Sequence, residues 1–149
     1  MKQKKIFPPT YLLTALALML GLHFLFPLVK VIVSPYDLLG ILLILSGVAL
    51  NIWAANFFDK VETSIKPFEE SSYLATEGLY KYSRNPMYFG MLMILIGTFI
   101  VLGSITPMLV IPVFMWIITK VFILAEEKAL EERFGETYLK YKCKVRRWI

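Results

Sequence analysis

The chain has 149 residues, of which 58% are hydrophobic and 18% charged, with a formal net charge of +5. Soluble domains have about 25% charged residues, so this composition opposes a soluble domain and excludes a disordered chain. The length fits one compact membrane-embedded domain, residues 1–149, rather than two domains. With one cysteine, Cys143, and one histidine, His23, a disulfide framework, a Cys-rich zinc site and a site of several histidines are excluded, so no metal centre is predicted.

Four stretches are apolar enough to cross a bilayer, and they are residues 11–33, 38–58, 87–102 and 107–124. A crossing helix needs roughly 20 apolar residues, and lipid leaves helix as the viable state for such segments. The last two stretches are short, and the turn of residues 103–107 between them is short and uncharged, so they are expected to form a tight antiparallel hairpin. The first run is too long for a signal peptide and lacks a small-residue cleavage site, so it is expected to be retained. The predicted fold is an all-α membrane protein with about four transmembrane helices.

Basic residues predict the orientation of these spans. Apart from Lys30 and Lys120, the lysines and arginines lie in the N-terminal segment, in residues 59–86 and in residues 125–149. With four spans, these three segments share one side of the membrane, and Lys30 lies on the other. The positive-inside rule therefore places both termini and any polar chemistry in the cytoplasm.

Polar residues gather where the cytoplasmic segments meet the last two spans. Arg84 precedes the third span, and Glu126 and Glu127 follow the fourth. If the last two spans form a hairpin, Arg84 and Glu126 both lie at its cytoplasmic mouth, where a cation and a carboxylate can hold a charged, polar ligand beside a lipid-soluble one. The alternative is that the glutamates only mark where the helix meets water. Asn85 precedes Pro86, which suits a first helical turn, and the ordinary interpretation of Asn85 is a helix N-cap.

The tail is predicted to continue the fourth span as a helix, with a break at Gly135. Its apolar side chains recur three or four residues apart and form one stripe, consisting of Leu130, Phe134, Tyr138 and Tyr141. Its basic residues suit an anionic lipid surface, although a solvated tail that fixes topology explains them equally well; they are Lys140, Lys142, Lys144, Arg146 and Arg147. A nucleic-acid partner is not expected for so short a patch beside the bilayer.

The absence of certain motifs argues against several classes of function. It has neither a Walker A motif nor a GxGxxG after a strand, which excludes a soluble Rossmann-type cofactor site. No acidic residue lies deep in a span, which argues against a small proton-coupled exporter. His23 lies alone in the first span and is interpreted as a hydrogen-bonding contact to a neighbouring helix.

Two motifs resemble those of the integral-membrane methyltransferases, which include isoprenylcysteine carboxyl methyltransferases and phospholipid N-methyltransferases. The stretch Arg84-Asn85-Pro86-Met87-Tyr88-Phe89-Gly90 is similar to their R-[HN]-P-x-Y-x-G signature. The second motif is Glu126-Glu127 followed by Leu130, Phe134-Gly135, Tyr138 and Tyr141. The resemblance covers residues 63–148, with both motifs in the family's order and spacing, but it leaves the substrate open.

The resemblance implies S-adenosylmethionine as the cofactor, bound at the cytoplasmic mouth of the last two spans, and a lipophilic methyl acceptor. Arg84 and Glu126 are the candidate catalytic residues, with Arg84 suited to holding a carboxylate and Glu126 to accepting hydrogen bonds from the cofactor. By position, the cofactor-contacting residues implied are Ser72, Tyr73, Leu74, Ala75, Tyr80, Asn85, Pro86, Met87, Tyr88, Glu126 and Glu127.

This chain departs from the family pattern at two positions. Asn85 replaces the commoner histidine, and an amide cannot act as a base. Phe122 occupies the position of an arginine found one turn before the glutamate in the prenylcysteine enzymes, which weighs against carboxyl methylation. Two alternatives stay open. One is an NADPH-dependent membrane reductase related to sterol reductases, and the other is a non-enzymatic membrane module.

Overall fold

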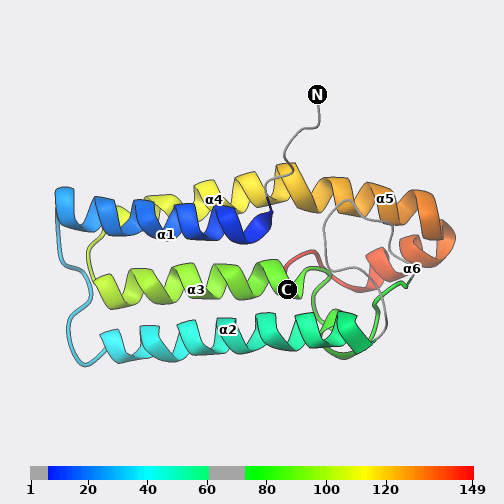
Figure 1. The fold of residues 1–149 in the computed structure, drawn as a ribbon, viewed down its shortest axis with the longest axis horizontal. Coiled ribbons are helices and arrows are strands. Elements are labelled where there is room, and N and C mark those ends of the chain that lie inside the picture. The colour runs from blue at the N-terminus through cyan, green and yellow to red at the C-terminus, as the bar shows by residue number, and fades with distance from the viewer. Residues whose placement is uncertain (1–6, 61–72) are drawn as a thin grey trace.

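The computed structural model describes residues 7–60 and 73–149. Long helices lie side by side in an up-down-up-down arrangement, and a short helix folds back at one end (Figure 1). In chain order the helical segments are α1 (Pro8–Leu25), α2 (Asp37–Lys60), η1 (Gly78–Lys81), α3 (Pro86–Leu102), η2 (Thr106–Leu109), α4 (Val110–Ile118), η3 (Thr119–Ile123), α5 (Leu124–Phe134) and α6 (Glu136–Lys144). The all-α prediction is therefore confirmed for the described residues.

Three helical stretches are long and apolar enough to cross a membrane. They are Pro8–Leu25, Asp37–Lys60 and Thr106–Phe134, the last of which runs continuously from η2 to α5. The prediction of about four spans is thus confirmed for three of them. The remaining predicted span, α3, is helical and apolar, but its 17 residues fall below the roughly 20 that a crossing helix needs.

The predicted end of the first span is wrong. The helix begins at Pro8 and ends at Leu25, whereas the sequence pattern extended the span to residue 33. Pro27 has no N–H to donate, so the helix cannot continue through it. The backbone instead pairs with the turn after α3. Val31 N donates to the Gly103 carbonyl at 2.7 Å, and Ile105 N donates to the Val29 carbonyl at 3.0 Å.

The predicted tight turn between the last two spans is present, but these two spans are not the pair that packs most closely. The turn after α3 is tight, with Gly103 at φ 71°, but the helix that approaches α3 most closely is α2. A Cβ on Gly47 would lie 2.5 Å from the Gly90 carbonyl oxygen, and one on Gly40 would lie 2.5 Å from the Gly97 carbonyl oxygen. Glycines seven residues apart on both helices therefore bring the two backbones together, as small residues do at membrane helix interfaces.

The core lies between α1, α3 and the long last helix. Its most buried side chains include Met19, Leu95, Phe114 and Ile118. Polar contacts close the end of the bundle near Gly103, where His23 Nδ1 lies 2.7 Å from Ser104 Oγ. This hydrogen bond confirms the interpretation of His23 as a contact to a neighbouring element.

The long last helix contains a π-helical segment, Thr119–Ile123, just before the paired glutamates. A π turn adds a residue to the helix and changes the direction of the side chains that follow, and such turns are frequent at functional sites. Phe122 in this segment is buried, with its ring edge-on to Tyr11 at a centroid distance of 5.3 Å. Beyond it, the helix continues through Phe134 and ends at Gly135, as the tail pattern predicts.

Candidate active site

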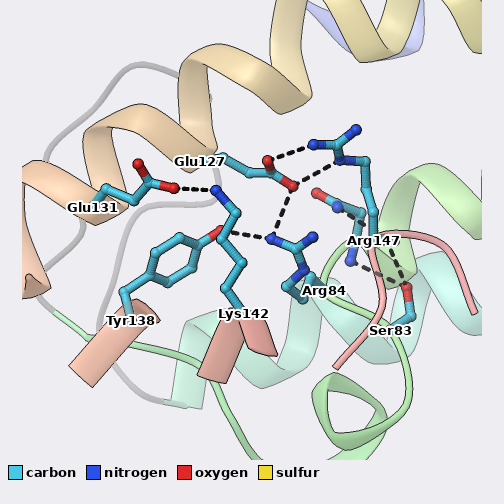
Figure 2. A network of polar contacts seen from close by, with 8 residues as sticks. Ser83, Arg84, Glu127, Glu131, Tyr138, Lys142 and Arg147 are labelled. Atoms are coloured by element: carbon cyan, nitrogen blue, oxygen red, sulfur yellow. Dashed lines mark hydrogen bonds and ion pairs between the residues drawn. The ribbon is translucent and has the colours of Figure 1, made fainter. Parts of the chain in front are cut away.

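The two sequence motifs meet at the end of the bundle where α6 folds back. Arg84 lies in the loop just before α3, and its side chain is 9% exposed. Its guanidinium NH1 is 3.1 Å from Oε1 of Glu127 and donates to the Tyr138 hydroxyl at 3.3 Å (Figure 2). Both partners belong to the second motif, so the tertiary structure joins segments that are more than 40 residues apart.

Glu127 is the centre of this polar cluster. Its side chain is only 6% exposed, and besides Arg84 it accepts two hydrogen bonds from Arg147, at 2.9 Å from Nε and 2.8 Å from NH2. Figure 2 shows the two guanidinium groups reaching the same carboxylate. The hydrogen bond to Glu127 raises the pKa of Arg147, so this guanidinium stays charged. A buried, charged carboxylate is costly unless it is paired and hydrogen-bonded, and the two guanidinium groups supply this to Glu127.

Glu126 has a different partner. Tyr88, in the first turn of α3, donates from its hydroxyl to Glu126 Oε1 at 2.7 Å. The sequence pattern placed Arg84 and Glu126 at the same mouth of the last two spans, and the structure brings both residues to the same end of the bundle. Arg84, however, contacts Glu127. Adjacent residues on a helix project about 100° apart, which lets the two carboxylates serve separate contacts.

The prediction that the side chain of Asn85 caps the helix is wrong. Asn85 precedes α3 as expected, with Pro86 at the first helical position, but its side chain makes no capping hydrogen bond. Asn85 Nδ2 instead donates to the backbone carbonyl of Arg147 at 3.0 Å. Asn85 and Pro86 are buried and Met87 is half-buried, so this part of the signature is packed inside the protein.

The segment that leads into the first motif lies beside the site. Ser72 lies outside the described residues. Tyr73 and Leu74 are half-buried, while Ala75 and Tyr80 are buried. Tyr80 packs among aromatic rings near the end of α2, namely Trp53, Phe57 and Phe58. Its carbonyl accepts a hydrogen bond of 2.6 Å from the Tyr141 hydroxyl, whose pKa is raised by burial.

The structure divides the basic tail into two groups. Arg147 binds Glu127, and Lys142 forms an ion pair with Glu131. Lys140, Lys144 and Arg146 are exposed, as expected of residues that meet lipid headgroups or solvent. The sequence analysis missed the role of Arg147, because the spacing of basic residues does not show which of them turns inward.

The sequence model of the phospholipid methyltransferase family matches residues 36–137, well over half of the chain. The chain belongs to this family. This finding confirms the resemblance noted from the two motifs, and S-adenosylmethionine is the methyl donor that the family uses.

Proteins similar in sequence to this chain include two named enzymes and one uncharacterized protein. A protein-S-isoprenylcysteine O-methyltransferase from Saccharomyces cerevisiae is 33% identical over 137 residues, covering 82% of this chain and 54% of that protein. One from Schizosaccharomyces pombe is 35% identical over 72 residues, covering 48% of this chain and 30% of that protein. An uncharacterized protein from Haemophilus influenzae is 40% identical over 63 residues, which are 42% of this chain and all of that protein.

The fold is also similar to a solved structure. The eukaryotic intramembrane Ras methyltransferase, an isoprenylcysteine carboxyl methyltransferase, superposes with a TM-score of 0.65 at 25% identity. The match covers 95% of this chain and 51% of the other. This chain therefore spans about half the length of that enzyme and of the yeast relative from Saccharomyces cerevisiae.

Proposed function

We propose that this protein transfers a methyl group from S-adenosylmethionine to a lipophilic acceptor at the cytoplasmic face of the membrane. The observation that carries the proposal is the meeting of both motifs in one cluster, through the Arg84–Glu127 ion pair at 3.1 Å and the Tyr88–Glu126 hydrogen bond at 2.7 Å. Both contacts connect the start of α3 to the start of α5, which is the place where the resemblance puts the cofactor.

The side chains at this place fit the polar groups of the cofactor. Arg84 Nε is buried and has no hydrogen-bond partner among the described residues, so it could donate to a carboxylate of the cofactor. Glu126 uses Oε1 for Tyr88, which leaves Oε2 to accept from a ribose hydroxyl or an amino group. The further candidate contacts are Ser72, Tyr73, Leu74, Ala75, Tyr80, Asn85, Pro86, Met87 and Glu127.

Methyl transfer requires these residues to position the reactants rather than to transfer a proton. When bound, S-adenosylmethionine supplies an electrophilic methyl group on a sulfonium centre. An in-line displacement depends on alignment and on a dry site, so an amide at position 85 in place of an imidazole is compatible with it. The buried Tyr88 donates a hydrogen bond to the Glu126 carboxylate, and aromatic rings pack around the buried Tyr80.

We consider three acceptor classes for the proposed transfer: a prenylcysteine carboxylate, a phospholipid amine and a small thiol. The names of the yeast relatives favour the first, and the family's description favours the second. Phe122 weighs against a carboxylate acceptor, because a buried aromatic ring stands where the resemblance expects an arginine. We therefore rank an amine or thiol acceptor above a carboxylate.

Mass spectrometry of acceptors incubated with the purified protein and isotope-labelled S-adenosylmethionine tests this function. The label is expected in a lipid-soluble acceptor, and a Glu126→Gln variant should transfer far less of it. Binding of NADPH without S-adenosylmethionine would favour the reductase alternative. A Glu126→Gln variant that keeps the transfer rate of the wild type would contradict the role given to Glu126.

The cytoplasmic placement of the site leads to a labelling prediction. Cys143 is exposed on α6, and Tyr36, at the opposite end of the bundle, is 63% exposed. In intact cells, an impermeant thiol reagent should leave the wild-type Cys143 unmodified and should label a Cys143→Ser, Tyr36→Cys variant. The reverse pattern would place the site on the outer face.

A further inference from the structure

The last described residues of the chain lie against the first motif. Residues 145–148 follow α6 and are here called the C-terminal strap. Arg84 N donates to the Arg146 carbonyl at 3.0 Å, and Asn85 Nδ2 donates to the Arg147 carbonyl at 3.0 Å. Ser83 Oγ also donates to the Arg147 carbonyl, at 3.4 Å. Two consecutive strap carbonyls therefore fix three consecutive residues of the loop that carries Arg84.

The strap also contributes a side chain to the cluster. The Arg147 guanidinium binds both oxygens of Glu127, with Nε at 2.9 Å from Oε1 and NH2 at 2.8 Å from Oε2. Figure 2 shows this fork approaching Glu127 from the side opposite to Glu131 and Lys142. A bidentate contact fixes the plane of the carboxylate, which a single point charge such as a lysine ammonium does not do.

Glu127 contacts both Arg147 and Arg84. Glu127 Oε1 accepts from Arg147 and is also the atom that lies 3.1 Å from Arg84 NH1. Arg84 NH1 contacts Glu127 and Tyr138, and Arg84 Nε is buried and has no hydrogen-bond partner among the described residues. Glu127 therefore links Arg147 to Arg84, whose Nε the proposed function assigns to the cofactor.

We propose that Arg147 is a positioning residue of the cofactor site, which acts through Glu127 on Arg84 and does not itself contact the cofactor. The proposal rests on the proposed function, because it takes the cofactor to bind at Arg84 and Glu126. It gives the C-terminal strap a part in binding that neither motif contains, since Arg147 lies beyond the last residue of both.

Calorimetric titration of S-adenosylmethionine into purified variants tests this role without any acceptor. Arg147→Gln is expected to raise the Kd about tenfold, because the charge-assisted contact of Arg84 with the cofactor would be weakened when Glu127 is no longer held. Arg147→Lys, which keeps the charge but loses the fork, should recover only part of the affinity. Arg146→Gln is the matched control, because its side chain is exposed and its strap carbonyl is unchanged; its Kd should equal that of the wild type.

Two further measurements separate positioning from a purely structural role. Each variant is compared with the wild type by melting temperature, and the titrations are made well below it, where all variants are folded. In a Glu127→Gln background, adding Arg147→Gln should cause no further loss of affinity, because Arg147 acts through Glu127. An Arg147→Gln variant with a lower melting temperature and an unchanged Kd, or a full additional loss in the double variant, would overturn the proposal.

Failure of the proposed function can be distinguished from failure of the role proposed for Arg147. If the wild type binds S-adenosylmethionine and transfers no methyl group to any acceptor, the proposed transfer reaction is wrong, while the comparison of Kd values still decides the role of Arg147. A wild-type chain that does not bind S-adenosylmethionine would overturn both proposals.

Discussion

Replacing Arg84 with glutamine is expected to weaken S-adenosylmethionine binding by roughly ten- to a hundredfold, because one charge-assisted hydrogen bond contributes about 1.5–3 kcal/mol. The variant also removes a partner from the buried Glu127, although the fork of Arg147 remains to pair it. Titration calorimetry of the purified variant measures the loss, and circular dichroism establishes that the helices are intact.

Lys144 provides the control for this experiment. It is exposed on α6, so Lys144→Gln should leave cofactor affinity unchanged and should weaken association with anionic vesicles by about 1 kcal/mol. Lys142 is less suitable, because it forms an ion pair with Glu131. Wild-type cofactor affinity and turnover in both Arg84→Gln and Glu126→Gln would show that the site assignment is wrong, although the fold would stand.

Replacing Gly47 with alanine should destabilise the bundle, although alanine favours helix over glycine by about 1 kcal/mol. The new Cβ would lie 2.5 Å from the Gly90 carbonyl oxygen, so α2 and α3 must move apart. Forcing an extra carbon into a packed interface costs about 1–3 kcal/mol. Thermal unfolding in detergent micelles should therefore show a lower midpoint than that of the wild type.

The matched control is Gly21→Ala in α1. A Cβ at Gly21 has no heavy atom within 4 Å, so this variant should be as stable as the wild type or more stable by up to about 1 kcal/mol. Equal melting temperatures for Gly47→Ala and Gly21→Ala would mean that the close approach of α2 and α3 does not contribute to stability.

The sequence by itself determined the helical class and the position of the two motifs. Long apolar runs can satisfy their backbone hydrogen bonds in lipid only as helices, so local composition was sufficient to place the helices that became α2 and α3. Local chemistry also determined the break at Gly135 and the start of α3 at Pro86. The first span was placed too long, because the apolar pattern continues past Pro27 even though the helix does not.

The tertiary structure alone decided which side chains meet. Hydrophobic periodicity shows which face of a helix is buried, but it does not show which distant residue will lie opposite it. The contact of Arg84 with Glu127 joins the loop before α3 to α5, and the contact of Arg147 with the same carboxylate depends on the return of the tail. Asn85 likewise donates to a strap carbonyl that no local motif predicts. The contacts of Asn85 and Arg147 form only when the chain after α6 returns to the loop before α3. There the buried carboxylate of Glu127 is paired with cations from both segments.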